Sequence, residues 1–435
     1  MSGIAELLQS LGFSVSGSDL GRGDSVKRLE SLGVRVMQGH AAANITGVEL
    51  VVFSSAIGAE NAELKAAREL KILAIPRAEM LAELMRLKYG IAVAGAHGKT
   101  TTTSMVAWIL TKADLDPTIV VGGRMDNFGG TNARLGKGKF MVVEADESDG
   151  SFNRLAHSIG VVTNMDREHL DHYGNMENLE TAFVQFLNKV PFYGVSIFCA
   201  DDPTLQKLQA KVSRRLITYG FTPGSTYHVT NYAPTPEGST TTFTVHGQEA
   251  ELKLQVPGKH NALNALAALA VAGEVGLTRE ASLGSLTTYT GVQRRFQKRG
   301  EKSGVVFIDD YAHHPSEISA TLSAVKERFP TGKLRVVFQP HRYSRVNDLF
   351  EQFTNCFSHC DHVAVTDVYA AGEKPIDGIS GESIASSIRL ANGIPAHHVK
   401  QPLDVMQEWA AEGAIGDVVV TLGAGDLPNV YQKLF

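Results

Sequence analysis

The chain has 435 residues, a formal net charge of −5 and 20% charged residues. This length allows two to four domains of roughly 100–200 residues each, and the acidic balance argues against a nucleic-acid-binding protein, which needs a basic face. No apolar run approaches the roughly 18 residues of a membrane helix, and the N-terminal stretch "MSGIAELLQSLG" lacks the basic start of a signal peptide. Three cysteines form no disulfide framework. We therefore expect a reducing, cytoplasmic setting without membrane insertion.

Strands alternate with amphipathic helices from the N-terminus onward, which predicts α/β architecture with mainly parallel sheets. We expect a first domain over residues 1–77. Its predicted strands lie at 14–19, 34–39, 49–56 and 72–76.

Two further domains are expected over residues 78–293 and 294–435. In the second, residues 225–257 are Thr-rich and alternate in polarity, which predicts antiparallel hairpins. The other strands predicted for the second domain are 89–95, 118–123, 140–146, 159–166 and 195–202. Those predicted for the third domain are 304–311, 333–340, 362–368 and 417–425.

The stretch "AVAGAHGKTTTTSMVAWIL", residues 92–110, runs from an apolar strand through a Gly-rich turn into a helix. Such a turn aims backbone N–H groups at one point, and the helix N-terminus adds partial positive charge. Lys99 can reach outer phosphates, and Thr100 can offer a hydroxyl to magnesium. The spacing is shorter than the Walker pattern, whose first glycine would fall at Val93. A phosphate loop is nevertheless favoured over a chance Gly-rich turn.

Two acidic clusters follow strands expected in the same sheet. They are "VVEADESDG" (142–150) and "TNMDREHLDHYG" (163–174). Ligands of α/β sheets bind beyond the carboxyl ends of the strands, and carboxylate oxygens suit magnesium. Together with the Lys99 loop they predict a metal-assisted phosphate site rather than two solvated loops.

These segments resemble those of the Mur ligase family of peptidoglycan synthesis. The motifs, in chain order, are "GAHGKTTTTS", "VVEADESDGSF", "NMDREHLDHYG", "GKHNALNALAA", "RRF", "DDYAHHP" and "FQPHRYSR". The resemblance covers nearly the whole chain. Within the family the motifs look like those of the member that adds the first amino acid.

The resemblance implies an N-terminal Rossmann-like domain for a UDP-sugar, a central ATPase domain and a C-terminal Rossmann-like domain for an amino acid. It implies that ATP phosphorylates the lactyl carboxylate of UDP-N-acetylmuramate, and that L-alanine then displaces phosphate from the acyl phosphate. ATP and magnesium are the implied cofactors. We expect a monomer or weak homodimer, and domain closure when ATP and the UDP-sugar bind.

The resemblance also implies the site residues. For ATP they are Gly95, Ala96, His97, Gly98, Lys99, Thr100, Thr101, Asn261, Arg295 and Asp309. For one magnesium they are Thr100 and Glu144, and His169 joins Glu144 at a second, although imidazole is an unusual magnesium ligand. Those with catalytic roles are Lys99, His169, Arg295, His313, His341, Arg342 and Arg345.

Substrate contacts are expected in the first and third domains. Asp19 ends a strand where a nucleotide-binding sheet places an acidic residue, and His40 and Ser55 also follow strand ends. The full substrate set is Asp19, His40, Ser55, Asn132, Tyr311, His313, Arg342 and Arg345. An arginine fork such as Arg342 with Arg345 can hold a carboxylate or a phosphoryl group.

The stretch "CFSHCDH" (356–362) suggests zinc, but we reject that interpretation. Cys356 and Cys360 are one helical turn apart in a segment with helical apolar spacing, and buried free cysteines behave as small hydrophobes. Structural zinc sites prefer a knuckle spacing that is absent here.

Three alternatives are disfavoured by the sequence. The motifs "QPHRYSR" and "DREHLDHYG" speak against a ligase that attaches a whole tripeptide to the same sugar nucleotide. The N-terminal sugar-nucleotide domain speaks against a folylpolyglutamate synthase, and the intact set of Lys99, Glu144, His169, Arg342 and Arg345 speaks against a non-catalytic nucleotide-binding protein. In the family that the chain resembles, a strand and a Gly-rich turn precede "MSGIAELLQSLG". We therefore expect residues 1–435 to be an N-terminally shortened form, with weakened binding of the UDP-sugar.

Overall fold

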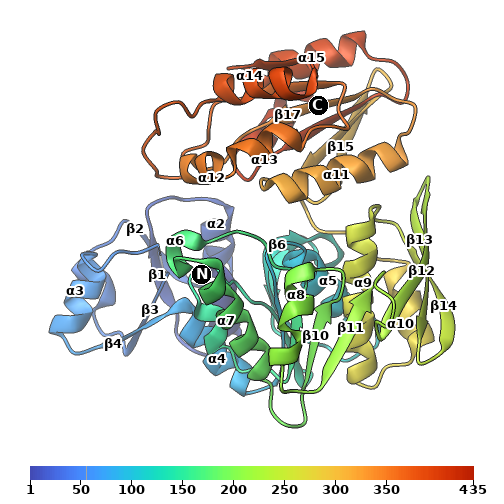
Figure 1. The fold of residues 1–435 in the computed structure, drawn as a ribbon. Coiled ribbons are helices and arrows are strands. Elements are labelled where there is room, and N and C mark those ends of the chain that lie inside the picture. The colour runs from blue at the N-terminus through green and yellow to red at the C-terminus, as the bar shows by residue number, and fades with distance from the viewer. Residues whose placement is uncertain (55) are drawn as a thin grey trace. The chain divides into compact units, whose positions relative to one another are not determined.

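The computed structural model describes residues 1–54 and 56–435 as helices packed on mainly parallel sheets (Figure 1). The chain divides into two compact units. Unit 1 holds Met1–Thr230, Phe243–Ala250 and Leu263–Leu286, and unit 2 holds Asn231–Thr242, Glu251–Ala262 and Thr287–Phe435. The predicted α/β class with mainly parallel sheets is confirmed. The domain boundaries at 77/78 and 293/294 stay predictions. Across the described residues no helix combines the length and apolar character needed to span a bilayer.

The N-terminal segment of unit 1 contains two separate two-stranded parallel sheets. One pairs β1 (Ser16–Asp19) with β2 (Arg35–Gln38), and the other pairs β3 (Leu50–Phe53) with β4 (Leu73–Pro76). The helices of this segment are α1 (Ser2–Ser10), α2 (Asp24–Ser31), α3 (Ala62–Glu69) and the 3-10 turn η1 (Ala42–Ile45). All four predicted strands are present, each shorter than its predicted range.

The central sheet has ten strands in the order β14-β13-β12-β11-β10-β9-β5-β8-β6-β7. Their bounds are β5 (Tyr89–Ala94), β6 (Thr118–Met125), β7 (Thr131–Arg134), β8 (Phe140–Glu144), β9 (Ile159–Val162), β10 (Val195–Cys199), β11 (Leu216–Gly220), β12 (Tyr227–Thr235), β13 (Gly238–Val245) and β14 (Gln248–Leu254). Strand β5 lies between β8 and β9 and runs parallel to both. Their carboxyl ends, and the loops that follow them, therefore meet at one edge.

Strand β5 separates two apolar layers, because successive side chains point to opposite faces. Ala92 and Ala94 belong to the core cluster that includes side chains of α4 (Arg77–Arg86) and α7 (Met176–Asn188). Helix α5 (Lys99–Lys112) packs on β5, β6 and β8, and its Ala107 clusters with Ile119. The remaining helices are α6 (Leu170–Tyr173), α8 (Pro203–Leu208), α9 (Lys259–Glu274) and α10 (Arg279–Leu286), with 3-10 turns η2 (Asp126–Phe128), η3 (Ser151–Arg154) and η4 (Gln209–Lys211).

Unit 2 is built on a six-stranded sheet in the order β15-β16-β20-β17-β18-β19. Its strands are β15 (Gln297–Lys302), β16 (Val305–Asp310), β17 (Leu334–Phe338), β18 (His362–Val365), β19 (Ala396–His398) and β20 (Val418–Leu422). Only the β15–β16 pair among the printed pairings of this sheet is antiparallel. The helices are α11 (Pro315–Arg328), α12 (Tyr343–Asp348), α13 (Phe350–Asn355), α14 (Gly381–Asn392), α15 (Pro402–Glu412) and α16 (Tyr431–Leu434), with the 3-10 turn η5 (Leu427–Val430).

The predicted helix through both cysteines of unit 2 is wrong in extent. Helix α13 ends at Asn355, Cys356 caps it, and Cys360 lies in the turn beyond. Both thiols are buried in the apolar core beside Phe353, and this burial raises their pKa. They pack as small hydrophobes, as the sequence predicted.

Candidate functional site

The loop from β5 to α5 has the backbone geometry of an anion site. Gly95 and Gly98 adopt φ values of +129° and +80°, and α5 begins at Lys99 directly after Gly98. A Cβ on Gly95 would lie 2.9 Å from the backbone nitrogen of Thr163, so that position requires glycine for space as well as for φ. The first N–H groups of α5 have no intrahelical acceptor and carry the positive end of the helix dipole. They can therefore receive phosphate oxygens.

Lys99 is held inside this loop by three acceptors. Its Nζ donates to the carbonyl oxygens of Gly95 (2.6 Å) and Ala96 (3.2 Å) and to Oε1 of Glu147 (2.7 Å). Burial lowers the pKa of Lys99, but nearby carboxylates, Glu147 foremost, raise it more, so the amine stays charged. Burial raises the pKa of Glu147 to about 7, against the opposing effect of Lys99. The loop thus contains a buried ion pair.

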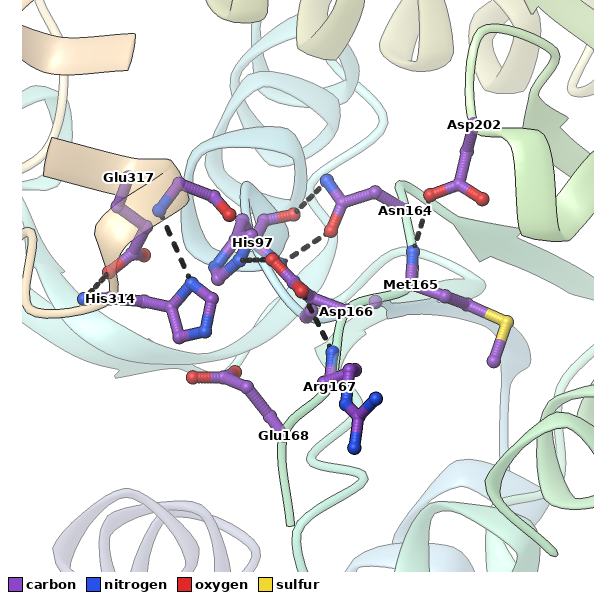
Figure 2. A network of polar contacts seen from close by, with 12 residues as sticks. His97, Asn164, Met165, Asp166, Arg167, Glu168, Asp202, His314 and Glu317 are labelled. Carbon is purple, nitrogen blue, oxygen red and sulfur yellow. Dashed lines mark hydrogen bonds and ion pairs between the residues drawn. The ribbon is translucent and has the colours of Figure 1, made fainter. Parts of the chain in front are cut away.

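Asn164, which the sequence analysis did not select, fixes the first half of the loop (Figure 2). Its Oδ1 accepts from the N–H of His97 (2.8 Å), its Nδ2 donates to the His97 carbonyl (3.0 Å), and its own carbonyl accepts from the N–H of Ala96 (3.1 Å). The His97 ring meets Asp166 at 3.1 Å. The N–H groups of Ala96 and His97 are therefore engaged, which leaves those from Gly98 onward for a phosphate.

The predicted metal ligands fall into two neighbouring groups. Thr100 donates its hydroxyl hydrogen to Oε1 of Glu144 (2.9 Å), whose Oε2 accepts from the N–H of Gly122 (2.6 Å). Nε2 of His169 lies 3.8 Å from Oε1 of Glu147, and His169 adopts a φ of +58°. The carboxylate-rich donor set fits magnesium. Oε2 of Glu147 is buried and has no hydrogen-bond partner among the described residues, so this oxygen could serve as a metal ligand.

The three ATP residues predicted in unit 2 each have a partner within that unit. The carboxylate of Asp309 is bound by Arg294 (3.2 Å) and by the Thr421 hydroxyl (2.9 Å). Arg295 instead meets Glu317 at 3.3 Å. Burial raises the pKa of Asp309. The third predicted residue, Asn261, donates its amide to the Pro257 carbonyl at 2.6 Å.

Several residues predicted to bind the amino acid form one aromatic and cationic cluster in unit 2. The rings of Tyr311 and His313 are 5.3 Å apart, and those of His313 and His341 are 5.8 Å apart. Nη1 of Arg345 approaches Nδ1 of His341 at 3.4 Å. Burial, together with the neighbouring cationic groups, lowers the pKa of His341 to about 4, so its ring is neutral at pH 7.

Tyr369 completes this cluster and was not predicted. Its ring stacks on His341 with centroids 5.5 Å apart and an interplanar angle of 9°. Its carbonyl accepts from the N–H of Arg342 at 2.9 Å. Arg342 adopts a φ of +67°, a strained conformation of the kind that functional sites retain. The contact with Tyr369 helps to hold Arg342 in that conformation.

The residues predicted to bind a UDP-sugar lie on the N-terminal segment and on β7. Oδ1 of Asp19, at the end of β1, accepts from the N–H of Gly21 (2.8 Å). His40 bonds Ser18 (2.9 Å), which donates to Glu63 (2.8 Å), a residue that the spacing did not reveal. Asn132 is half-buried on β7, and Ser55 lies outside the described residues.

Three models of one protein family match this chain. The "Mur ligase family, catalytic domain" model matches residues 1–89, the "Mur ligase middle domain" matches 93–272, and the "Mur ligase, glutamate ligase domain" matches 294–425. The likeness that the motifs suggested therefore extends along most of the chain.

Curated relatives are similar over the full length of the chain. The UDP-N-acetylmuramate--L-alanine ligase of Sorangium cellulosum is 50% identical over 439 residues, covering 100% of this chain and 93% of the relative. That of Myxococcus xanthus is 48% identical, covering 100% and 92%. The crystal structure of UDP-N-acetylmuramate-alanine ligase from Thermotoga maritima matches with a TM-score of 0.84 and 29% identity, covering 100% of this chain and 95% of that one.

Proposed function

Because this chain belongs to the Mur ligase family, we propose that it joins L-alanine to the lactyl carboxylate of UDP-N-acetylmuramate at the expense of ATP. The observation that carries the proposal is the 50% identity, along the whole chain, to a relative named for this reaction. A shared fold alone would not distinguish the substrates. The reaction is a step in the synthesis of peptidoglycan precursors.

The first step is the transfer of the γ-phosphoryl group to the lactyl carboxylate. A carboxylate oxygen forms a bond to the γ-phosphorus while the bond from phosphorus to the bridging oxygen of ADP breaks, leaving an acyl phosphate. Two anions must meet, so positive charge has to be concentrated where they react. The N-terminus of α5 and the ammonium of Lys99 supply that charge from this chain.

We further propose that a magnesium ion assists this step by neutralising charge on the phosphates. Thr100 and Glu144 are close enough to share a metal site, and His169 lies beside a second carboxylate. Gly95, Gly98 and Thr101 remain assigned to the ATP phosphates, and Asn261, Arg295 and Asp309 to the rest of the nucleotide.

The second step is the attack of the amine of L-alanine on the acyl carbon. The C–N bond forms through a tetrahedral intermediate, the amine loses a proton, and phosphate leaves with the bond electrons. Arg342 and Arg345 would hold a carboxylate or the departing phosphate. The neutral ring of His341 can accept a hydrogen bond from the amine, which a protonated ring could not.

The remaining assignments are proposals of the same kind. Asp19, His40, Ser55 and Asn132 are assigned to the UDP-sugar. We propose a cytoplasmic monomer or weak homodimer that binds no nucleic acid and does not insert into a membrane.

An amide-formation assay with a panel of amines tests the proposed function. The purified chain is mixed with ATP, magnesium and UDP-N-acetylmuramate, and with L-alanine, glycine, L-serine or L-Ala-γ-D-Glu-meso-diaminopimelate in separate reactions. We expect ADP and amide in equal amounts, with L-alanine preferred over the tripeptide. Preference for the tripeptide would assign the chain to the recycling reaction, and ADP release without the UDP-sugar would contradict the proposal.

A further inference from the structure

Two histidine side chains that the proposed reaction does not use meet at the edge of the unit 2 sheet. Nε2 of His362, the first residue of β18, lies 2.9 Å from Nδ1 of His397 on the edge strand β19. The two strands are parallel, and Ala364 is paired with His397. Because side chains alternate along a strand, His362, Ala364 and His397 point to the same face of the sheet. Both histidine rings are only half-buried, so a small ion can reach them from solvent.

The histidine pair is separate from the two cysteines that precede it in sequence. The ring of His362 packs beside Trp409 of α15, with ring centroids 5.2 Å apart. Cys356 and Cys360 instead belong to the apolar cluster of Val363, the next residue of β18, whose side chain points to the opposite face. The sheet therefore lies between the histidine pair and the thiols, and an ion held by the histidines would not involve sulfur.

The contact between the two rings requires at least one of the facing nitrogens to be unprotonated. A hydrogen bond between imidazoles joins one N–H donor to one lone-pair acceptor. Burial is the main cause that lowers the pKa of both His362 and His397, so the neutral form of each ring is favoured near pH 7. The neutral imidazole is the form that ligates metal ions.

Charged groups of both signs surround the pair. Those whose charge reaches one of the two rings are Arg335, Glu382, Arg389, Glu408 and, when protonated, His398. Arg389 lies 3.8 Å from Glu382, which offsets its charge. Glu408 is exposed on α15, so its carboxylate is free to change rotamer. A dication at the pair would therefore not meet an excess of positive charge.

We propose that His362 and His397 bind a transition-metal dication such as Zn²⁺, with water and the carboxylate of Glu408 as further ligands. Two nitrogens bound to tetrahedral Zn²⁺ at about 2.0–2.1 Å are separated by about 3.3 Å, so the rings have to part by only about 0.4 Å. The hydrogen between the rings moves to the outward nitrogen of its own ring, and no net proton is released. Imidazole selects Zn²⁺ or Cu²⁺ over Mg²⁺. The ion would tie the edge strand β19 to β18, and the inference does not depend on the proposed function.

Calorimetric titration of Zn²⁺ into the full chain tests the proposal, with Mg²⁺ in excess to occupy sites made of oxygen ligands. We expect one Zn²⁺ whose affinity falls at least about tenfold in His362→Gln and in His397→Gln, because even partners outside the first ligand shell change metal affinity by about 10–100-fold. Glu408→Gln should weaken binding less than either histidine variant. Equal Zn²⁺ affinity in the parent and both histidine variants would overturn the proposal.

His398→Gln is the matched control, because it removes a histidine from the next position of the same strand. The side chain of His398 points to the other face, and its Nε2 lies 2.7 Å from Oδ1 of Asp367. This variant should keep the Zn²⁺ affinity of the parent, and so should Cys356→Ser/Cys360→Ser. A loss in His398→Gln as large as that in His397→Gln would contradict the assignment of the ligands.

Chemical protection of the parent chain provides a second test that needs no variant to fold. Diethyl pyrocarbonate modifies accessible imidazoles, and mass spectrometry of peptides reports the rate at each histidine. With free Zn²⁺ about tenfold above its Kd, modification of His362 and His397 should slow roughly tenfold, because about a tenth of the chains remain without the ion. His359, exposed in the preceding turn, should react at an unchanged rate. Equal rates with and without Zn²⁺ at His362 and His397 would overturn the proposal.

Discussion

The replacement of Asn164 by alanine tests whether the phosphate loop is held ready for its ligand from outside the loop. The amide of Asn164 makes two hydrogen bonds to the backbone of His97, one as acceptor and one as donor. A typical intramolecular hydrogen bond contributes about 0.5–1.5 kcal/mol, so the loss of both should cost about 2 kcal/mol. If that cost falls on the binding-competent loop, ADP affinity should decrease by roughly 30-fold.

Isothermal titration with ADP and magnesium measures this change, and thermal unfolding reports any general loss of stability. Asn164→Asp is the informative companion, because it keeps the acceptor for the His97 N–H but loses the donor and adds negative charge near the phosphates. Its ADP affinity should fall at least as far as that of Asn164→Ala, whereas its thermal stability should fall less. ADP affinities within about twofold of the parent in both variants would refute the idea that Asn164 prepares the loop.

Three further predictions concern other parts of the molecule. Tyr369→Ala should raise the KM for L-alanine by roughly three- to tenfold, because a stacked aromatic pair contributes about 0.5–1.5 kcal/mol. Tyr369→Phe keeps the ring on His341 and should leave the KM nearly unchanged, so equal effects of both variants would contradict a stacking role. The double variant Cys356→Ser/Cys360→Ser should keep its activity and metal content and lose a modest amount of stability, because both side chains are buried in the core. If the parent instead held stoichiometric zinc and this variant did not, our rejection of a zinc site at the cysteines would be wrong. Burial lowers the pKa of His157 to about 4, below its ordinary value of 6.5, so the unfolded state binds more protons than the folded state between these pH values. The free energy of unfolding of unit 1 should therefore fall by up to about 3 kcal/mol as pH decreases through this window. His157→Gln should flatten this pH dependence of stability, and an unchanged pH dependence would assign the acid sensitivity to other groups.

The sequence predicted those features that depend on patterns along the chain. Alternation of apolar strands and amphipathic helices predicted the α/β class, and the Gly-Lys-Thr turn after an apolar strand predicted the loop of Gly98 and Lys99. The alternation of polarity in residues 225–257 likewise predicted β12, β13 and β14, which are successive neighbours in the sheet.

Features that depend on side-chain direction could not be predicted in the same way. Arg294 and Arg295 are adjacent in sequence, yet Arg294 meets Asp309 whereas Arg295 meets Glu317. Likewise, Glu144 and Glu147 occupy one acidic motif, and nothing in their spacing shows that Glu144 bonds Thr100 while Glu147 holds Lys99.

Long-range partners were missed for a related reason. Asn164 reaches the loop because β9 lies beside β5, and that adjacency is a property of sheet order rather than of local sequence. The turn that ends α13 before Cys360 was missed because the apolar spacing continues past Asn355 even though the helix does not.

The central claim is that phosphate is transferred to the lactyl carboxylate before the amide forms. An isotope experiment tests this most directly: UDP-N-acetylmuramate labelled with ¹⁸O in both carboxylate oxygens is turned over with ATP, magnesium and L-alanine, and the inorganic phosphate is analysed by mass spectrometry. The account predicts one ¹⁸O in each phosphate released, with one amide formed per ADP. Phosphate without ¹⁸O, accompanied by amide formation, would contradict it.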